Sequence, residues 1–396
     1  MSSTRTRATL ILWAVAAWMN LLGLTHAWGA TGDSLPKDSL HKIDAYVAAQ
    51  MRAQRIPGVQ VGIYRQGRIV LAKGYGLANV ELGVPVRPQM MFQSGSVGKQ
   101  FTATGVMLLV EAGRVKLEDS ITQYFPGSPP SWQPIKVKHL LGQTSGLGQY
   151  ANHERTQPFG PFNLQRQVTE DEALARIQSM RLDFRPGERW LYCDTNYVLL
   201  GMLIRKVTGQ FYGDFLAQRI FKPLGMSATG IISDSAVVPN RVAGYRLEGG
   251  VLKNQDWIAP FYNSTGDGAL HVNVLDFAKW DAALYGDTLL KKSSLEQMWT
   301  PIVLNDGTRN VANYGFGWFI RTISGHRVIE HGGGWQGFTA HIARYVDDGI
   351  TVVVFSNLAS AGSSEMAHAI AGFYDAKLTP GPDAEEIKGL EDYDTV

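Results

Sequence analysis

Strand-like patterns lie near both ends of this chain, whereas helical spacing dominates the middle, and this arrangement limits the folds available to it. The pattern predicts β-strands over residues 59–64 and 68–73. It predicts two further strands over residues 339–345 and 350–355. We therefore expect strands from the two ends of the chain to share one sheet.

Helical patterns flank and separate these strands. Residues 40–54 and 364–377 predict helices, and Gln66-Gly67 predicts the tight turn of a hairpin. Residues 95–286 show mostly helical spacing, broken by loops rich in proline and glycine. One of these loops, residues 148–163, carries three aromatic residues and is a candidate border of a substrate cleft.

The most informative motif is Ser96-Val97-Gly98-Lys99, which opens a long apolar run. If the helix predicted over residues 101–113 includes this motif, Ser96 and Lys99 lie on the same face, one turn apart. A serine hydroxyl beside an amine that can deprotonate it is a nucleophile with its own base. The positive end of the helix dipole also favours an oxyanion at Ser96.

Two later segments add polar groups that such a nucleophile needs. A block over residues 184–197 contains Tyr192, and His331-Gly332-Gly333-Gly334 lies between two strand-like runs. The second segment matches the oxyanion motif of lipase-type α/β-hydrolases, but in those enzymes the motif precedes the nucleophile in the chain. Here it follows the nucleophile, so the α/β-hydrolase interpretation is rejected.

With these motifs the sequence resembles the serine β-lactamase-like superfamily, specifically the branch of class C β-lactamases, D,D-peptidases and D-aminopeptidases or esterases. The resemblance follows the chain in order over most of its length. The segments that carry it are residues 56–58, 74–78, 92–99 and 140–147, the block around Tyr192, the glycines after His331, and residues 355–357.

The resemblance implies a role for each motif. Ser96 resembles the acylated nucleophile, Lys99 its partner, and Tyr192 the tyrosine base of the family. His331-Gly332-Gly333 resembles the third motif, which is Lys-Thr-Gly in most β-lactamases. The residues expected to be catalytic are Ser96, Lys99, Tyr192 and His331, and those expected to bind substrate are Asp194, Gly332 and Gly333.

The implied fold is α+β, of the β-lactamase/transpeptidase type. An antiparallel sheet built from both chain ends and flanked by helices would meet a mostly helical inserted subdomain, with the active site in the crevice between them. The catalytic domain is expected at residues 31–380, its sheet part at 31–94 and 300–380, and its helical part at 95–299. The acidic residues 381–396 are expected to form a loosely held tail.

Three positions depart from the family pattern. Asp194 stands where asparagine is common, Gln143 replaces a usual histidine, and His331 stands in place of lysine. That lysine is a permanent cation for the carboxylate of a β-lactam or a D-alanine terminus, whereas a histidine near its reference pKa of about 6.5 is mostly neutral at pH 7. Potent β-lactamase activity is therefore disfavoured.

The general base is either Lys99 or Tyr192, because neither removes a proton well at its ordinary pKa of about 10 and each can assist the other. A cationic Lys99 and a protonated His331 would lower the pKa of Tyr192. Backbone N–H groups of Ser96 and Gly334 are expected to form the oxyanion hole. The predicted cycle is acylation of Ser96, release of an amine or alcohol, and hydrolysis of the acyl-enzyme.

Composition excludes several partners. The net charge is only +2, from 37 basic and 35 acidic residues, so no nucleic-acid partner is expected. The nine histidines show no paired metal-ligand spacing, so we expect no metal, and nothing in the sequence indicates another cofactor. The single cysteine, Cys193, cannot form an internal disulfide and is assigned no role.

The N-terminus has the layout of a secretory signal peptide. Arg5 and Arg7 precede an apolar run over residues 8–24, and small and polar residues follow. We expect a signal peptide over residues 1–30, cleaved at about residues 27–30, and a bacterial protein that is secreted or periplasmic. Stable membrane insertion is expected only if this segment stays uncleaved.

These inferences lead to a secreted serine hydrolase that acylates Ser96 and cleaves an amide or ester bond, with a D-amino-acid peptide or a small ester as substrate. A β-lactamase or cell-wall D,D-carboxypeptidase is the alternative enzyme. A non-catalytic binding or assembly module is the third hypothesis, because a fold does not guarantee activity.

Overall fold

Seven strands from both ends of the chain form the main sheet of the structure, a computed structural model that describes residues 35–150 and 163–381. The strands lie in the order β3-β2-β1-β12-β11-β10-β9, and each neighbouring pair is antiparallel. Their bounds are β1 (Gly58–Arg65), β2 (Arg68–Asn79), β3 (Val84–Pro85), β9 (Phe319–Ile323), β10 (His326–Trp335), β11 (Phe338–Tyr345) and β12 (Ile350–Ser356). The predicted sharing of one sheet by both chain ends is confirmed.

The hairpin between β1 and β2 has the predicted turn. Gln66 and Gly67 both have positive φ, 48° and 76°, as in the turns whose twist matches that of paired strands. A Cβ atom on Gly67 would lie 2.2 Å from the Cβ of Ala282, so this position also requires glycine for the close approach of the next layer.

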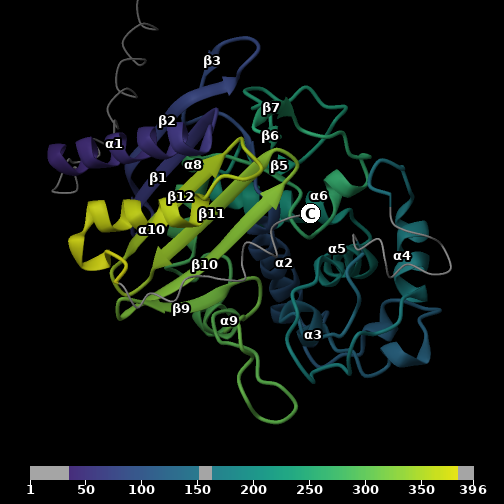
Figure 1. Ribbon diagram of the computed structural model, residues 1–396. Helices are drawn as coiled ribbons and strands as arrows, with labels where there is room; N and C mark the ends of the chain where they lie inside the picture. The colour runs from purple at the N-terminus through teal and green to yellow at the C-terminus, as the bar shows by residue number, and fades with distance from the viewer. Residues whose placement is uncertain (1–34, 151–162, 382–396) are drawn as a thin grey trace, which may run out of the picture. The chain divides into compact units, whose positions relative to one another are not determined.

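Two helices from opposite ends of the chain cover one face of the sheet. Helices α1 (Lys37–Gln54) and α10 (Ser363–Tyr374) pack against each other, and α10 packs against β11 and β12, as Figure 1 shows. Ile43 and Val47 are four residues apart and therefore face the same way on α1. They join Met366 and Ile370 of α10 and the inward side chains of the strands in one apolar cluster.

Helix α8 (Val274–Ala283) packs against β1, β2 and β12. It begins at Asn273, whose side chain accepts hydrogen bonds from the backbone N–H groups of Leu275 and Asp276. Helix α8 belongs by sequence to the predicted helical part, residues 95–299, but it packs against the main sheet. The sheet part of the structure therefore includes a helix from the segment predicted as the helical part.

The middle of the chain contains helices and two small sheets. The helices are α2 (Lys99–Glu111), α3 (Val137–Leu141), α4 (Glu170–Ser179), α5 (Asp194–Thr208), α6 (Tyr212–Leu216), α7 (Lys222–Leu224) and α9 (Lys292–Met298). In one small sheet the strand order is β4 (Phe92–Gln93), β8 (Leu270–Val272), β5 (Gly230–Ile231). The other small sheet pairs β6 (Tyr245–Glu248) with β7 (Val251–Asn254). The sequence did not predict these short strands, because two to four residues are too few to display a period.

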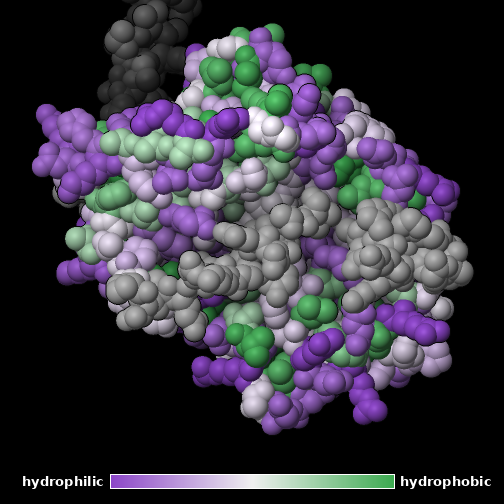
Figure 2. Space-filling model, viewed as in Figure 1, coloured by the Kyte–Doolittle hydropathy of each residue, from purple (hydrophilic) through white to green (hydrophobic). Residues whose placement is uncertain are grey.

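The described surface carries scattered apolar side chains. Leu82, Val237, Trp257 and Val311 are exposed at separate places in the chain, and on the face in Figure 2 apolar residues are interspersed with hydrophilic ones. Within residues 35–150 and 163–381, no helix has the length and apolar character needed to cross a membrane. The predicted signal peptide and residues 382–396 of the predicted tail lie outside the described residues.

Asp281 anchors α8 to the sheet through a buried ion pair. Its carboxylate accepts hydrogen bonds from Arg344 Nε at 2.8 Å, Thr351 Oγ1 at 2.7 Å and the backbone N–H of Gly67 at 3.0 Å. Both charged side chains have 0% exposure. We predict that Asp281→Ala lowers the free energy of unfolding by about 3–5 kcal/mol, because it leaves the Arg344 charge buried without its partner.

Denaturant unfolding followed by circular dichroism measures this loss. The control is Asp287→Ala, which removes an exposed carboxylate and is expected to leave the unfolding midpoint unchanged. Equal midpoints for the two variants would contradict the anchoring role.

Candidate active site

Ser96 lies in a short 3-10 turn, Gly95–Gly98, which runs directly into α2. The predicted helix therefore begins at Lys99, two residues earlier than residue 101, and it ends at Glu111. Lys99 Nζ donates a hydrogen bond to Ser96 Oγ at 2.8 Å. Ser96 has 9% exposure and Lys99 has none, so the predicted pairing forms at the edge of the protein interior.

The ammonium of Lys99 makes three hydrogen bonds. Besides Ser96 Oγ, its acceptors are Asp194 Oδ1 at 2.6 Å and the backbone carbonyl of Asp267 at 2.7 Å. An ammonium has three N–H donors, so all of them are used, and the Asp194 carboxylate balances its charge. Asp194 is the first residue of α5, and its other oxygen accepts a hydrogen bond from Gln149 Nε2 at 2.8 Å.

Asp267 was not predicted from the sequence. It lies between Gly266 and Gly268, where the backbone comes very close to the Ser96 turn: a Cβ on Gly268 would lie 2.3 Å from the carbonyl oxygen of Gly95. Thr102 Oγ1 on α2 donates to the carbonyl of Gly266 at 2.7 Å and fixes this approach. The Gly-Asp-Gly pattern was the available signal, because paired glycines often mark close backbone contact.

Tyr192 lies beside the ammonium of Lys99. The distance from Lys99 Nζ to the centre of the Tyr192 ring is 4.9 Å, within the range of a cation–π contact. The backbone on either side is held by Gln143, whose carbonyl accepts from Leu191 N and whose Oε1 accepts from Cys193 N, both at 3.1 Å. The departure at Gln143 thus has a structural role that positions the tyrosine.

His331 is buried behind this cluster and is neutral. Its ring centre lies 6.1 Å from that of Tyr192, its Nδ1 lies 2.5 Å from the carbonyl of Gly332, and its Nε2 lies 3.1 Å from the Tyr314 hydroxyl. Because a carbonyl only accepts, Nδ1 carries the proton and Nε2 accepts from Tyr314. Burial, together with the charge of Lys99, lowers the pKa of His331 to about 3.

Burial and the neighbouring cation destabilise the charged form of His331, so a protonated His331 is not the group that lowers the pKa of Tyr192. With both ring nitrogens engaged, His331 orients Tyr314 and the start of the glycine segment.

The glycine segment of β10 packs directly on the Ser96 turn. A Cβ on Gly333 would lie 2.2 Å from the carbonyl oxygen of Ser94 and 2.9 Å from the backbone nitrogen of Ser96, and a Cβ on Gly95 would lie 2.6 Å from the nitrogen of Gly334. This contact brings the backbone N–H groups predicted for the oxyanion hole near each other. Gly332 is paired with His341 in the sheet and does not line the pocket described next.

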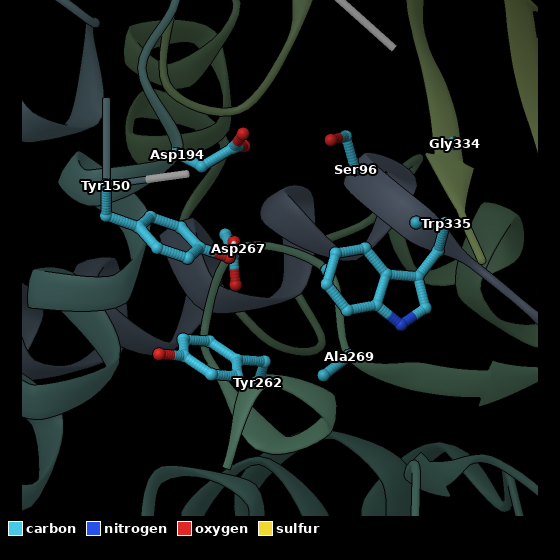
Figure 3. Close-up of a pocket in the computed structure, with 10 residues that line it drawn as sticks. Ser96, Tyr150, Asp194, Tyr262, Asp267, Ala269, Gly334 and Trp335 are labelled. Carbon is cyan, nitrogen blue, oxygen red and sulfur yellow. Dashed lines mark hydrogen bonds between the residues drawn. The ribbon is translucent and has the colours of Figure 1, made fainter. Parts of the chain in front are cut away.

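A pocket with aromatic walls opens onto Ser96. In Figure 3, Asp194 and Ser96 lie at one end, and Trp335 faces Tyr150 and Tyr262 across the pocket. Tyr150 and Tyr262 stack with ring centres 6.0 Å apart, and Trp335 Nε1 donates to Asn263 Oδ1 at 2.8 Å. The predicted cleft loop contributes Tyr150, whereas residues 151–162 lie outside the described residues. The lining residues are Gly95, Ser96, Tyr150, Asp194, Tyr262, Asp267, Gly268, Ala269, Gly334 and Trp335.

The described lining is acidic. Burial, and next the charge of Asp194, raises the pKa of Asp267 to about 6, and the Tyr150 hydroxyl lies 3.1 Å from its carboxylate. The described lining contains no histidine or cysteine, so only these carboxylates could hold a metal, and Asp194 is already paired with Lys99. Cys193 lies nearby, but burial raises the pKa of its thiol to about 12, so it is not a nucleophile at neutral pH.

This fold and this arrangement of serine, lysine and tyrosine define a β-lactamase-like protein, and the chain belongs to the Beta-lactamase family, whose model matches residues 43–374. It is a family of serine hydrolases. The resemblance inferred from the motifs is thereby confirmed.

Individual relatives are similar at moderate identity. The chain is 30% identical to penicillin-binding protein 4* of Bacillus subtilis over 306 residues, which are 74% of this chain and 66% of that protein. The octameric penicillin-binding protein homologue from Pyrococcus abyssi has a TM-score of 0.74 at 29% identity, covering 84% of this chain and 76% of that one. A D-stereospecific amidohydrolase from Streptomyces sp. has a TM-score of 0.70 at 27% identity, covering 84% and 98%.

The contact between Gly333 and the Ser96 turn generates a prediction. Gly333→Ala is expected to slow labelling of Ser96 by a fluorophosphonate about a hundredfold or more, because the added Cβ pushes β10 away from the backbone of Ser94 and Ser96. The control is Gly230→Ala, where a Cβ meets no atom within 4 Å. Labelling rates followed by intact-mass spectrometry measure the effect, and equal rates in both variants would contradict it.

Proposed function

We propose that the protein is a secreted serine hydrolase that cleaves an amide or ester bond through an acyl-enzyme on Ser96. The observation that carries this proposal is the 2.8 Å hydrogen bond between Lys99 Nζ and Ser96 Oγ beside a pocket that reaches Ser96. Membership of a serine hydrolase family supports the same reaction class. Secretion rests on the N-terminal pattern of basic, apolar and small residues.

In this proposal Tyr192 is the general base for acylation. Lys99 uses all three ammonium protons as donors and so has no lone pair to accept the proton of Ser96. The proton passes to Tyr192 as Ser96 Oγ attacks the carbonyl carbon, and Lys99 stabilises the charge that develops on Oγ. The backbone N–H groups of Ser96 and Gly334 hold the carbonyl oxygen as it becomes an oxyanion.

The intermediate then collapses. The bond between the carbonyl carbon and the leaving group breaks, and the proton held by Tyr192 goes to the departing amine or alcohol. A water molecule subsequently attacks the acyl carbon, its proton is taken up by the same base, and the bond to Ser96 Oγ breaks. The serine regains a proton and the acid product leaves.

The charges around the pocket favour a substrate with a cation near the scissile bond. Asp194 and Asp267 line the described part of the pocket, and Lys99 is paired with Asp194. His331 is neutral and cannot bind a substrate carboxylate as the family lysine would. We therefore assign the substrate class as amides, esters or peptides of D-amino acids with a free ammonium group. Similarity to a D-stereospecific amidohydrolase supports this choice.

Substitutions in the catalytic unit test the acyl-enzyme. Ser96→Ala is expected to abolish turnover, and Lys99→Ala and Tyr192→Phe are each expected to leave only a small residual rate, because members of one catalytic unit act together. Tyr374→Phe, on α10, is the matched control and is expected to keep the full rate.

The measurement is the intact mass of the protein after exposure to a fluorophosphonate and, separately, to a penicillin. One fluorophosphonate adduct per chain, absent from Ser96→Ala, is expected. No adduct in the unsubstituted protein would contradict the acyl-enzyme and leave a binding module. Rapid turnover of penicillin would instead move the substrate class to β-lactams or cell-wall peptides.

The raised pKa of Asp267 generates a pH prediction. A carboxyl group with a pKa of about 6 is protonated below that pH and ionised above it, so affinity for a substrate ammonium rises with pH. Between pH 5 and 7 the ionised fraction rises about tenfold, from about a tenth to about nine tenths, and KM for a D-amino-acid amide is expected to fall by a similar factor. The substrate amine stays mostly charged over this range.

Two comparisons make this prediction specific. KM for a neutral N-acetylated ester is expected to stay constant between pH 5 and 7, and Asp267→Asn is expected to flatten the profile of the amide substrate. Parallel KM profiles for the charged and neutral substrates would contradict the role of Asp267.

A further inference from the structure

A second cluster of titratable side chains lies on the face of the sheet turned away from the pocket. Glu330 is on β10, His341 on β11 and His368 on α10, and their ligand atoms all lie within 4.8 Å of one another. The exposed fractions are 0%, 1% and 6%. Glu330 precedes His331 in β10, so the two side chains point to opposite faces of the sheet.

Hydrogen bonds do not satisfy all the buried polar atoms of this cluster. His368 Nε2 lies 3.0 Å from Glu330 Oε2 but has no hydrogen-bond partner, so the ring nitrogen is not aligned with that oxygen. His341 Nε2 is 3.4 Å from the same oxygen, beyond the usual range for such a bond. A buried polar atom without a partner is expensive, and here three ligand atoms converge within an otherwise apolar layer.

We propose that Glu330, His341 and His368 form a binding site for a divalent metal ion of the zinc type, which fastens α10 to the sheet. Two histidine nitrogens and one carboxylate oxygen are a common ligand set for zinc. Tetrahedral bonds of about 2.0–2.1 Å place neighbouring ligand atoms about 3.3–3.4 Å apart, close to the 3.0 and 3.4 Å separations found here. The fourth position would be filled by water.

Neighbouring groups complete the second layer of the site. The Tyr345 hydroxyl lies 2.9 Å from His368 Nδ1, which holds the ring so that Nε2 points into the cluster. Arg321 Nε lies 2.8 Å from Glu330 Oε1 and leaves Oε2 for the metal. Glu365 lies on α10 one turn before His368, is exposed, and acts electrostatically on His341, so it supplies negative charge toward an incoming cation.

This proposal departs from the sequence-based expectation that the chain binds no metal. That expectation rested on short spacings between ligands, whereas these three residues come from two strands and a helix. The site is independent of the proposed hydrolase function, because none of its ligands lines the pocket.

The test is zinc binding by the full chain, purified without a histidine tag and stripped with a chelator. Calorimetric titration with zinc sulfate is expected to give one bound ion per chain, confirmed by elemental analysis after dialysis. Saturating zinc is expected to raise Tm by about 4 °C or more, because the ion binds only the folded state. Cobalt(II) is expected to show the intense visible absorption of a tetrahedral site.

Two variants locate the site, and a third serves as control. His368→Ala and the conservative Glu330→Gln are expected to lose the bound zinc and the Tm shift, whereas His326→Ala, which removes a partly exposed histidine paired with Asp348, is expected to keep both. Ser96→Ala is also expected to bind zinc normally. Absence of bound zinc in the stripped and reloaded protein, or an unchanged stoichiometry in folded Glu330→Gln and His368→Ala, would overturn the proposal.

Discussion

A lysine ammonium buried with no exposed surface needs an acceptor for each of its three N–H bonds, and this requirement organises the site. The acceptors are Ser96 Oγ, Asp194 Oδ1 and the carbonyl oxygen of Asp267, each 2.6–2.8 Å from Lys99 Nζ. Asp267 is 168 residues away from Lys99 in the chain. Removing a charged partner from such a pair typically costs about 3–5 kcal/mol, because the remaining charge stays buried. The position of Ser96 therefore depends on the packing of three distant segments around one cation.

That packing requires backbones to approach without side chains between them. Gly333 and Gly95 allow β10 to lie against the Ser96 turn, and Gly268 allows the Asp267 segment to contact the same turn from another direction. The N–H groups expected to stabilise an oxyanion come from this contact, so the glycines that permit the close approach also determine the electrostatics of the site. A larger residue at Gly333 would separate the sheet from the Ser96 turn while leaving most of the fold intact.

Local patterns were enough to predict the terminal strands, the Gln66-Gly67 turn and the pairing of Ser96 with Lys99, because each depends on residues close together in the chain. The position of Tyr192 followed from the family resemblance. Asp267 was missed, since its flanking glycines indicate a close backbone contact but do not reveal which distant segment it meets. The extent to which the pKa of His331 is lowered could not be predicted either, because it is set by burial and by the nearby Lys99, and neither can be seen in a sequence.

Two departures from the family pattern act in the same direction. Aspartate in place of asparagine at Asp194 adds a negative charge beside Lys99, and histidine in place of lysine at His331 removes a positive one, since the ring is neutral. Either change alone would weaken attraction for a substrate carboxylate. Together they make the surroundings of Ser96 about two charge units more negative than the usual pattern, and the proposed recognition of a substrate ammonium rests on this charge balance.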